Sequence, residues 1–168
     1  SITGQRYLSD LLKRIAPHDR ICDYGAGHGT FVKQLATRGF QADGFDPVIE
    51  NDFVKQIPLN NLALIPEGYS KIIIVETLQH LPDANNVLID LANRLQPGGE
   101  IIIYDRLGTQ LTRCYKAICQ MRGLSMYGPY SPFKETWHSK KSLESTLLET
   151  GLNLQTFRVL SGSNVRSK

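Results

Sequence analysis

Seven residues, Asp23-Tyr24-Gly25-Ala26-Gly27-His28-Gly29, limit what this chain can fold into, because they join an apolar run to a helical pattern. The run from Arg20 to Tyr24 predicts a buried strand, and the pattern from Thr30 to Arg38 predicts a helix that ends at Gly39. Glycines at such a turn allow positive φ and let a ligand approach the backbone. The helix that follows presents its free N–H groups to that ligand. The turn therefore predicts a ligand site at the end of a strand.

Apolar runs and helical patterns alternate along the rest of the chain, which is typical of βαβ units around a parallel sheet. Further strands are predicted at 41–45, 72–75, 101–104 and 152–160, and further helices at 7–15, 84–95, 108–122 and 139–150. A reduced third strand is predicted at 60–65. Because only 161–168 follow the late strand, the seventh strand is predicted to be missing or truncated. The expectation is one α/β domain over 1–168, with a Rossmann-like, doubly wound, mostly parallel sheet and helices on both faces.

Composition excludes several classes of protein. At 41% hydrophobic residues, the chain holds no apolar run near the roughly 18 residues of a membrane span. Its three cysteines form neither a disulfide framework nor a metal-binding pair, which favours a reducing, cytoplasmic compartment. Residues 105–168 carry 10 basic and 4 acidic side chains, a balance that fits either an anionic partner or scattered solvated charges. Without a run of five like charges, nucleic acid is not an expected partner.

The spacing of the glycines separates two kinds of ligand. A dinucleotide fingerprint has the pattern GxGxxG, but here the third glycine is one residue early and Thr30 occupies the expected position. Asp23, two places before the first glycine, would repel a pyrophosphate and suits a cationic amino-acid group. The loop therefore disfavours a nicotinamide oxidoreductase.

The loop and four later segments resemble the class I S-adenosylmethionine-dependent methyltransferases. Within that family they are most similar to the small-molecule branch that includes ubiquinone and menaquinone biosynthesis enzymes. The family features are an acidic residue before GxGxG, an acidic residue ending strand two, an EVLEHLPD-like segment after strand four, an LxPGG turn and a late helix. They match Asp23 to Gly29, Phe45-Asp46-Pro47, Val75 to Asp83, Leu95 to Gly99 and His138 to Leu152.

This resemblance implies a cofactor and a set of binding residues. The cofactor would be S-adenosyl-L-methionine, with S-adenosyl-L-homocysteine as product, and no metal is implied. The methionine part would lie against Asp23, Gly25, Ala26, Gly27 and Gly29. Asp46, with Pro47, would accept hydrogen bonds from the ribose hydroxyls. The segment after strand four would contribute Glu76, Thr77 and Leu78. Because no acidic residue ends the reduced third strand, we expect backbone groups and Leu62 or Leu64 at the adenine.

The catalytic side is expected above the carboxyl ends of the fourth and fifth strands, where open α/β sheets bind ligands. His80 is the candidate general base, although it could equally cap its loop or pack beside the cofactor. An aromatic, proline-rich loop at 126–133 and nearby basic residues suggest an aromatic, lipid-like or anionic small-molecule acceptor. The candidate acceptor residues are Arg106, Tyr127, Tyr130, Trp137 and His138.

Two readings of function remain open from the residues. The leading one is methyl transfer to a small molecule with an oxygen, nitrogen or carbon nucleophile. The alternative is a catalytically inactive cofactor-binding or scaffolding module of the same fold. A nucleic-acid methyltransferase of the amino-group type would carry an NPPY-like tetrapeptide where this chain has Glu76-Thr77-Leu78-Gln79.

Overall fold

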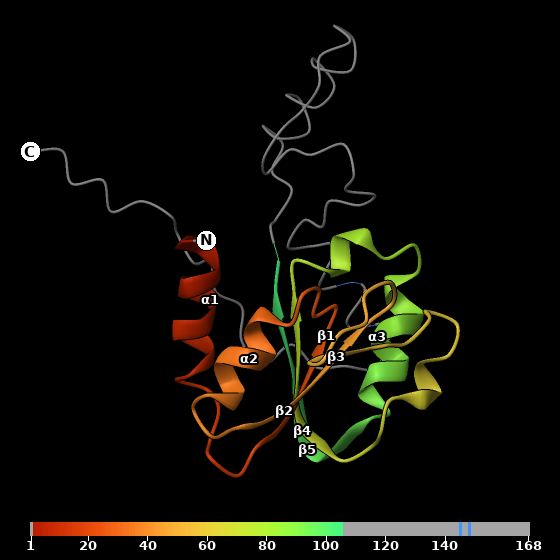
Figure 1. Cartoon of the computed structure of the whole chain (residues 1–168). Helices are drawn as coiled ribbons and strands as arrows, with labels where there is room; N and C mark the ends of the chain where they lie inside the picture. Colours follow the sequence, from red (N-terminus) through yellow and green to blue (C-terminus); the bar gives the residue numbers. More distant parts are fainter. Residues whose placement is uncertain (1, 106–144, 146–147, 149–168) are drawn as a thin grey trace, which may run out of the picture.

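The computed structural model describes residues 2–105 together with Ser145 and Leu148. Its strands form one parallel sheet in the order β3-β2-β1-β4-β5 (Figure 1). The strands are β1 Arg20–Tyr24, β2 Gln41–Asp46, β3 Val54–Gln56, β4 Tyr69–Val75 and β5 Leu95–Tyr104. The order reverses at β1, which pairs with β2 on one side and with β4 on the other. The predicted doubly wound α/β class is confirmed, and ligands of such sheets bind at this reversal.

Helices cover both faces of the sheet. The helices α1 Ile2–Leu11 and α2 Thr30–Ala36 lie on one face, and α3 Ala84–Ala92 lies on the other (Figure 1). Two short 3-10 helices, η1 Leu62–Leu64 and η2 Leu78–His80, complete the described elements. In the described part of the chain, no helix has the length and apolar character needed to cross a membrane.

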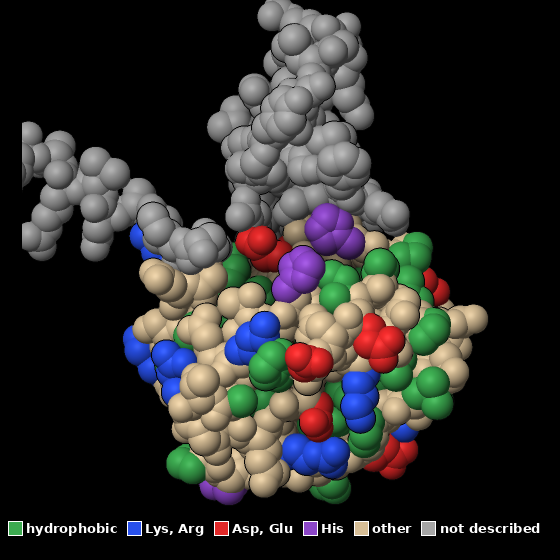
Figure 2. Space-filling view, viewed as in Figure 1, with side chains coloured by type: hydrophobic (Ala, Val, Ile, Leu, Met, Phe, Trp, Pro, Cys, Tyr) green, Lys and Arg blue, Asp and Glu red, His purple; other side chains and the backbone are tan. Residues whose placement is uncertain are grey.

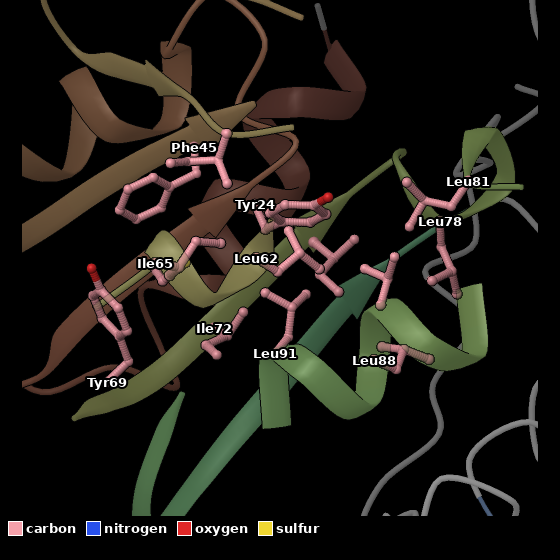
Figure 3. Packing of buried hydrophobic residues seen from close by; sticks show 14 residues of the cluster. Tyr24, Phe45, Leu62, Ile65, Tyr69, Ile72, Leu78, Leu81, Leu88 and Leu91 are labelled. Carbon is pink, nitrogen blue, oxygen red and sulfur yellow. The ribbon is translucent and has the colours of Figure 1, made fainter. Parts of the chain in front are cut away.

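Alternation along the central strands divides the core in two. In β4, Ile72 and Ile74 face α3, whereas Ile73 faces α1 and α2. The α3 side also contains Tyr24, Leu62, Leu88 and Leu91, which pack closely in Figure 3. All three isoleucines are fully buried, as their uninterrupted apolar run predicts for a strand covered on both faces.

The third strand is where the sequence prediction is wrong. It was expected at 60–65, but β3 is Val54–Gln56 and pairs in parallel with the end of β2. Only Val54 of its residues is buried, so a three-residue edge strand leaves almost no apolar periodicity to detect. The apolar residues at 62–64 form η1, where Leu62 is buried in the core. The predicted elements at 108–122, 139–150 and 152–160 lie outside the described residues, apart from helical Ser145 and Leu148, and the predicted absence or truncation of a seventh strand stays a prediction.

The observed bounds of two helices differ from the predicted ones. The first helix begins earlier than the expected 7–15, and α3 ends three residues before the expected Leu95, because Leu95 already pairs with Tyr69 in the sheet. Acidic and basic side chains are interspersed over the face seen in Figure 2. No single sign of charge therefore dominates that face.

Candidate functional site

The glycine loop follows β1 at the carboxyl edge of the sheet. Gly25, Gly27 and Gly29 have φ values of 76°, 53° and 74°, in the left-handed region that favours glycine. The N–H groups of Gly25 and Ala26 both donate to the carbonyl oxygen of Phe45, at 2.8 and 3.1 Å. A Cβ added at Gly25 would overlap the side chain of Thr77. The first glycine is therefore required by the protein's own packing.

Gly27 and Gly29 differ from Gly25 in what surrounds them. A Cβ at Gly27 would meet no atom within 4 Å, so this glycine faces open space. A Cβ at Gly29 would contact Val54 and Phe53. The loop thus has one glycine packed against Thr77 after β4, one packed against Val54 of β3 and Phe53 before it, and one facing open space.

Asp46 holds the glycine loop and the turn after β2 together. Its Oδ2 accepts from the Gly27 N–H at 3.0 Å, and its Oδ1 accepts from the N–H groups of Val48 and Ile49 at 2.9 Å each. An ionised carboxylate offers about four acceptor positions, so these bonds leave limited capacity for a ligand hydroxyl. Its predicted contact with the ribose stays a prediction, and Pro47 lies in the turn that Asp46 holds.

Asp23 is the most unusual group at this edge. Its side chain is only 2% exposed, and its Oδ1 has no hydrogen-bond partner among the described residues. Burial, and then the nearby charge of Asp46, raise the pKa of Asp23 to about 7. A buried carboxyl without a partner is costly when ionised. A cationic group placed beside it would remove that cost.

A cavity of about 410 Å³ opens beside Asp23. Four of the predicted cofactor residues line it, namely Asp23, Gly25, Ala26 and Glu76. Sequence reasoning missed its other lining residues, which come from α1, α2 and the end of β4: Gly4, Gln5, Tyr7, Thr30, Phe31, Gln34 and Val75. For Thr30, Phe31 and Gln34, their place in the first turns after the glycine loop was an available signal.

Glu76 lines this cavity in a strained conformation. Its φ of 51° is the only positive value of a non-glycine residue in the described part of the chain. Its N–H donates to the carbonyl of Tyr104 at 2.7 Å, and its own carbonyl accepts from Gln79 Nε2 at 3.2 Å. Residues held in sparsely populated backbone regions cluster at functional sites, where the surrounding structure fixes them. Gln79, 1% exposed, was not singled out from the sequence.

The remaining predicted residues lie away from the cavity lining. The hydroxyl of Thr77 donates to the carbonyl of Val75 at 3.0 Å and lies 3.3 Å from that of Gly25, whereas Leu78 is buried in the core beside α3. His80, the candidate base, is exposed at the end of η2. Leu62 is buried in the core and does not present its side chain to a ligand, while Leu64 is 58% exposed. Arg106, Tyr127, Tyr130, Trp137 and His138 lie outside the described residues.

The fold and this site define a class of protein. A parallel sheet that reverses at β1, a glycine loop at the reversal and a carboxylate closing β2 define a Rossmann-like domain that binds its ligand at the carboxyl edge. The chain belongs to the family described as "Methyltransferase domain", whose model matches residues 3–156. The predicted membership in the class I S-adenosylmethionine-dependent methyltransferases is confirmed.

Individual relatives agree with this assignment. The mitochondrial ubiquinone biosynthesis O-methyltransferase of Homo sapiens is 27% identical over 88% of this chain and 47% of its own length. A SAM-dependent methyltransferase from Archaeoglobus fulgidus superposes with a TM-score of 0.66 at 17% identity, covering 89% of this chain and 67% of that one. Magnesium protoporphyrin IX methyltransferase from Synechocystis, solved with bound SAH, gives 0.61 at 16% identity, with 89% and 74% covered. The chain spans less than half the length of the first curated relatives it matches.

Proposed function

We propose that this domain binds S-adenosyl-L-methionine in the cavity beside the glycine loop and transfers its methyl group to a small molecule. The observation that carries the proposal is Asp23, which lines the cavity and whose buried Oδ1 has no hydrogen-bond partner among the described residues. The amino-acid end of the cofactor carries an ammonium group, which would pair with this carboxylate. The family membership supports the same ligand.

The residues present fit that cofactor. Apart from Gly27 and its two chain neighbours, no atom of the described residues lies within 4 Å of the position that a Cβ of Gly27 would occupy. The backbone of the loop is therefore accessible to a ligand there, and a side chain at this position would take up the ligand's space. Asp46 closes the neighbouring strand and would direct its remaining acceptor capacity to the ribose hydroxyls. On this arrangement the ligand runs from Asp23 across the loop toward Asp46.

The chemistry asks little of the protein beyond alignment. The sulfonium of the cofactor is an activated leaving group, so the domain must hold the acceptor in line and remove its proton where one is lost. Orientation alone can supply roughly 7–11 kcal/mol of such a barrier. We assign the acceptor to the carboxyl ends of β4 and β5, with exposed His80 as the candidate base. The curated relatives are O-methyltransferases, which favours an oxygen nucleophile.

Isothermal calorimetry with S-adenosylhomocysteine tests the binding site. Asp46→Ala should weaken binding by about 1.5–3 kcal/mol, because a charged acceptor is lost from both the loop and the ligand. Asp43→Ala is the matched control: Asp43 lies on the same strand but accepts from Tyr69 at 2.8 Å, whereas Asp46 accepts from Gly27 of the glycine loop. Unchanged affinity in folded Asp46→Ala would remove Asp46 from the site, and binding of NAD by the wild type would contradict the proposed cofactor.

A turnover assay then separates the enzyme from the inactive module. The wild-type chain is incubated with S-adenosylmethionine and a panel of aromatic, lipid-like and anionic acceptors that offer oxygen, nitrogen or carbon nucleophiles, and methylated product is followed by mass spectrometry. Product methylated at oxygen supports the proposed transfer. Tight binding of S-adenosylhomocysteine without any product across oxygen, nitrogen and carbon acceptors would favour the non-catalytic alternative.

A further inference from the structure

Helix α1 belongs to the ligand cavity although it precedes every recognisable motif. Gly4, Gln5 and Tyr7 of this helix line the same cavity as Gly25 and Ala26 of the glycine loop. The apolar side of the helix packs on the sheet through Leu8 and Leu11, which are 5% and 0% exposed. The position of α1 therefore sets the shape of one cavity wall.

Tyr104, the last residue of β5, contacts α1 at two points. Its ring stacks on Tyr7 with 5.0 Å between centroids, and its hydroxyl donates to Asp10 Oδ2 at 2.9 Å. The same carboxylate oxygen accepts from Arg14 Nε at 2.7 Å, and the Asp10 side chain is only 15% exposed. A partly buried, charge-assisted hydrogen bond of this kind is stronger than one on the surface.

The backbone of Tyr104 reaches a second wall of the same cavity. Its carbonyl accepts from the N–H of Glu76, the lining residue with a positive φ. Burial, and then the hydrogen bond to Asp10, raise the pKa of Tyr104, so its hydroxyl remains a donor at neutral pH. Tyr104 thus contacts both α1 and Glu76, which line the cavity, without being a lining residue itself.

We propose that Tyr104 is a positioning residue for the cofactor, because its bond to Asp10 and its stack on Tyr7 keep α1 seated as a wall of the cavity. This inference rests on the proposed function, which supplies the identity of the ligand. When only a fraction of molecules has α1 seated, the apparent Kd rises in inverse proportion to that fraction. Loss of the Tyr104 hydroxyl therefore weakens binding without removing any contact to the ligand.

The test compares two tyrosines of the same sheet in the full 168-residue chain. Tyr104→Phe removes the hydroxyl and retains the stacked ring. Tyr69→Phe is the matched control, because Tyr69 is buried, also donates to an aspartate, Asp43, at 2.8 Å and lies at the opposite edge of the sheet. Calorimetry with S-adenosylhomocysteine should show Kd raised about fivefold to tenfold in Tyr104→Phe and unchanged in Tyr69→Phe. Equal Kd values in the two variants would overturn the proposal.

Hydrogen exchange tests whether the expected loss of affinity accompanies a change in α1. The amides of α1 should exchange faster in ligand-free Tyr104→Phe than in the wild type, and saturating S-adenosylhomocysteine should restore their protection. Asp10→Ala, which removes the acceptor, should give the same effect, and the double variant should be no weaker in binding than either single one. If Tyr104→Phe fails to fold, Asp10→Ala decides the question alone. Additive losses of affinity, or α1 exchange unchanged in both variants, would also refute the proposal.

These outcomes keep the two proposals apart. A wild-type chain that does not bind S-adenosylhomocysteine contradicts the proposed function, whatever the variants do. If the wild-type chain binds it, but neither the Kd nor the amide exchange of α1 changes when the Tyr104 hydroxyl is removed, only the positioning role is contradicted.

Discussion

Two buried aspartates at opposite ends of β1 have opposite surroundings. Asp19, at the amino edge of the sheet, is 6% exposed and accepts from the Ala16 N–H at 2.6 Å and from the Ser70 hydroxyl at 2.7 Å. Asp23, at the carboxyl edge, is 2% exposed and has one oxygen without a partner among the described residues. The two residues are four positions apart along the chain, Asp19 just before β1 and Asp23 within it, yet only the carboxylate of Asp19 is satisfied by the described residues.

The pKa values of the two aspartates follow this difference. Burial on its own would raise the pKa of Asp19, but its hydrogen bonds from Ala16 and Ser70 outweigh burial and lower it. Burial raises the pKa of Asp23 to about 7, because no such bonds offset it and the charge of Asp46 adds to it. At the amino edge the protein itself therefore satisfies the buried carboxylate, whereas at the carboxyl edge Asp23 keeps an oxygen without a partner among the described residues.

The largest effect is expected from a substitution at Gly25, the glycine of the carboxyl edge with the closest neighbouring atoms. Gly25→Ala should abolish S-adenosylhomocysteine binding and destabilise the fold by about 3 kcal/mol or more, because a Cβ would overlap Thr77 and the φ is 76°. Gly68→Ala is the counterpart at the amino edge, with φ 86° and its nearest neighbour, an Arg20 nitrogen, 3.7 Å away. It should cost about 1–2 kcal/mol of stability and leave Kd unchanged. Chemical denaturation and calorimetry measure both, and equal effects on binding would contradict the assignment of the site.

The next largest effect is expected when Asp23 and Asp19 are each replaced by asparagine. Asp23→Asn should weaken S-adenosylhomocysteine binding about tenfold to 100-fold, since it removes the charge that faces the ligand ammonium. Its ligand-free stability at pH 8 should be unchanged or higher, because a buried, unpaired charge is gone. Asp19→Asn should instead lose about 1–3 kcal/mol of stability at unchanged Kd. The reverse pattern in paired melting and binding measurements would show that the ligand-facing carboxylate has been misidentified.

The smallest expected effect is a pH dependence that sharpens the contrast. Because the folded pKa of Asp23 lies near 7, above its ordinary value of 3.8, the ligand-free protein should lose stability as pH rises from about 4 through 7. Affinity for S-adenosylhomocysteine should rise about tenfold between pH 6 and 8 as Asp23 ionises. Asp19 has a lowered pKa, so its stabilisation is present above pH 3.8 and lost below it. Asp23→Asn should flatten the binding profile, and a profile unaffected by that change would assign the titration to another group.

Local patterns predicted the parts of the fold that local chemistry decides. The glycine turn after β1, the Ile72-Ile73-Ile74 run and the position of Asp46 at the end of β2 were all readable from neighbouring residues. The third strand was not, because Val54 alone marks it and its pairing partner Gly44 lies on another strand.

The missed parts of the site depend on contacts between distant segments. Nothing in the sequence of α1 indicates that Tyr7 lines a cavity, because its place is set by stacking on Tyr104. The strain at Glu76 is imposed by bonds to Tyr104 and Gln79 in the folded chain. The Asp23 oxygen that has no partner among the described residues can likewise be found only from the folded arrangement of its neighbours.

The strand order also fixes when the site can exist during synthesis on the ribosome. The glycine loop and Asp46 emerge early, but β1 remains without its second neighbour until β4 has been translated. Glu76 and the Tyr104 carbonyl that accepts its N–H are translated only after β4. A nascent chain halted before β5 has the glycine loop but lacks the carbonyl that bonds to Glu76, so the cavity is incomplete at that point. A ligand that needs the complete cavity can therefore stabilise the domain only after β5 has joined the sheet.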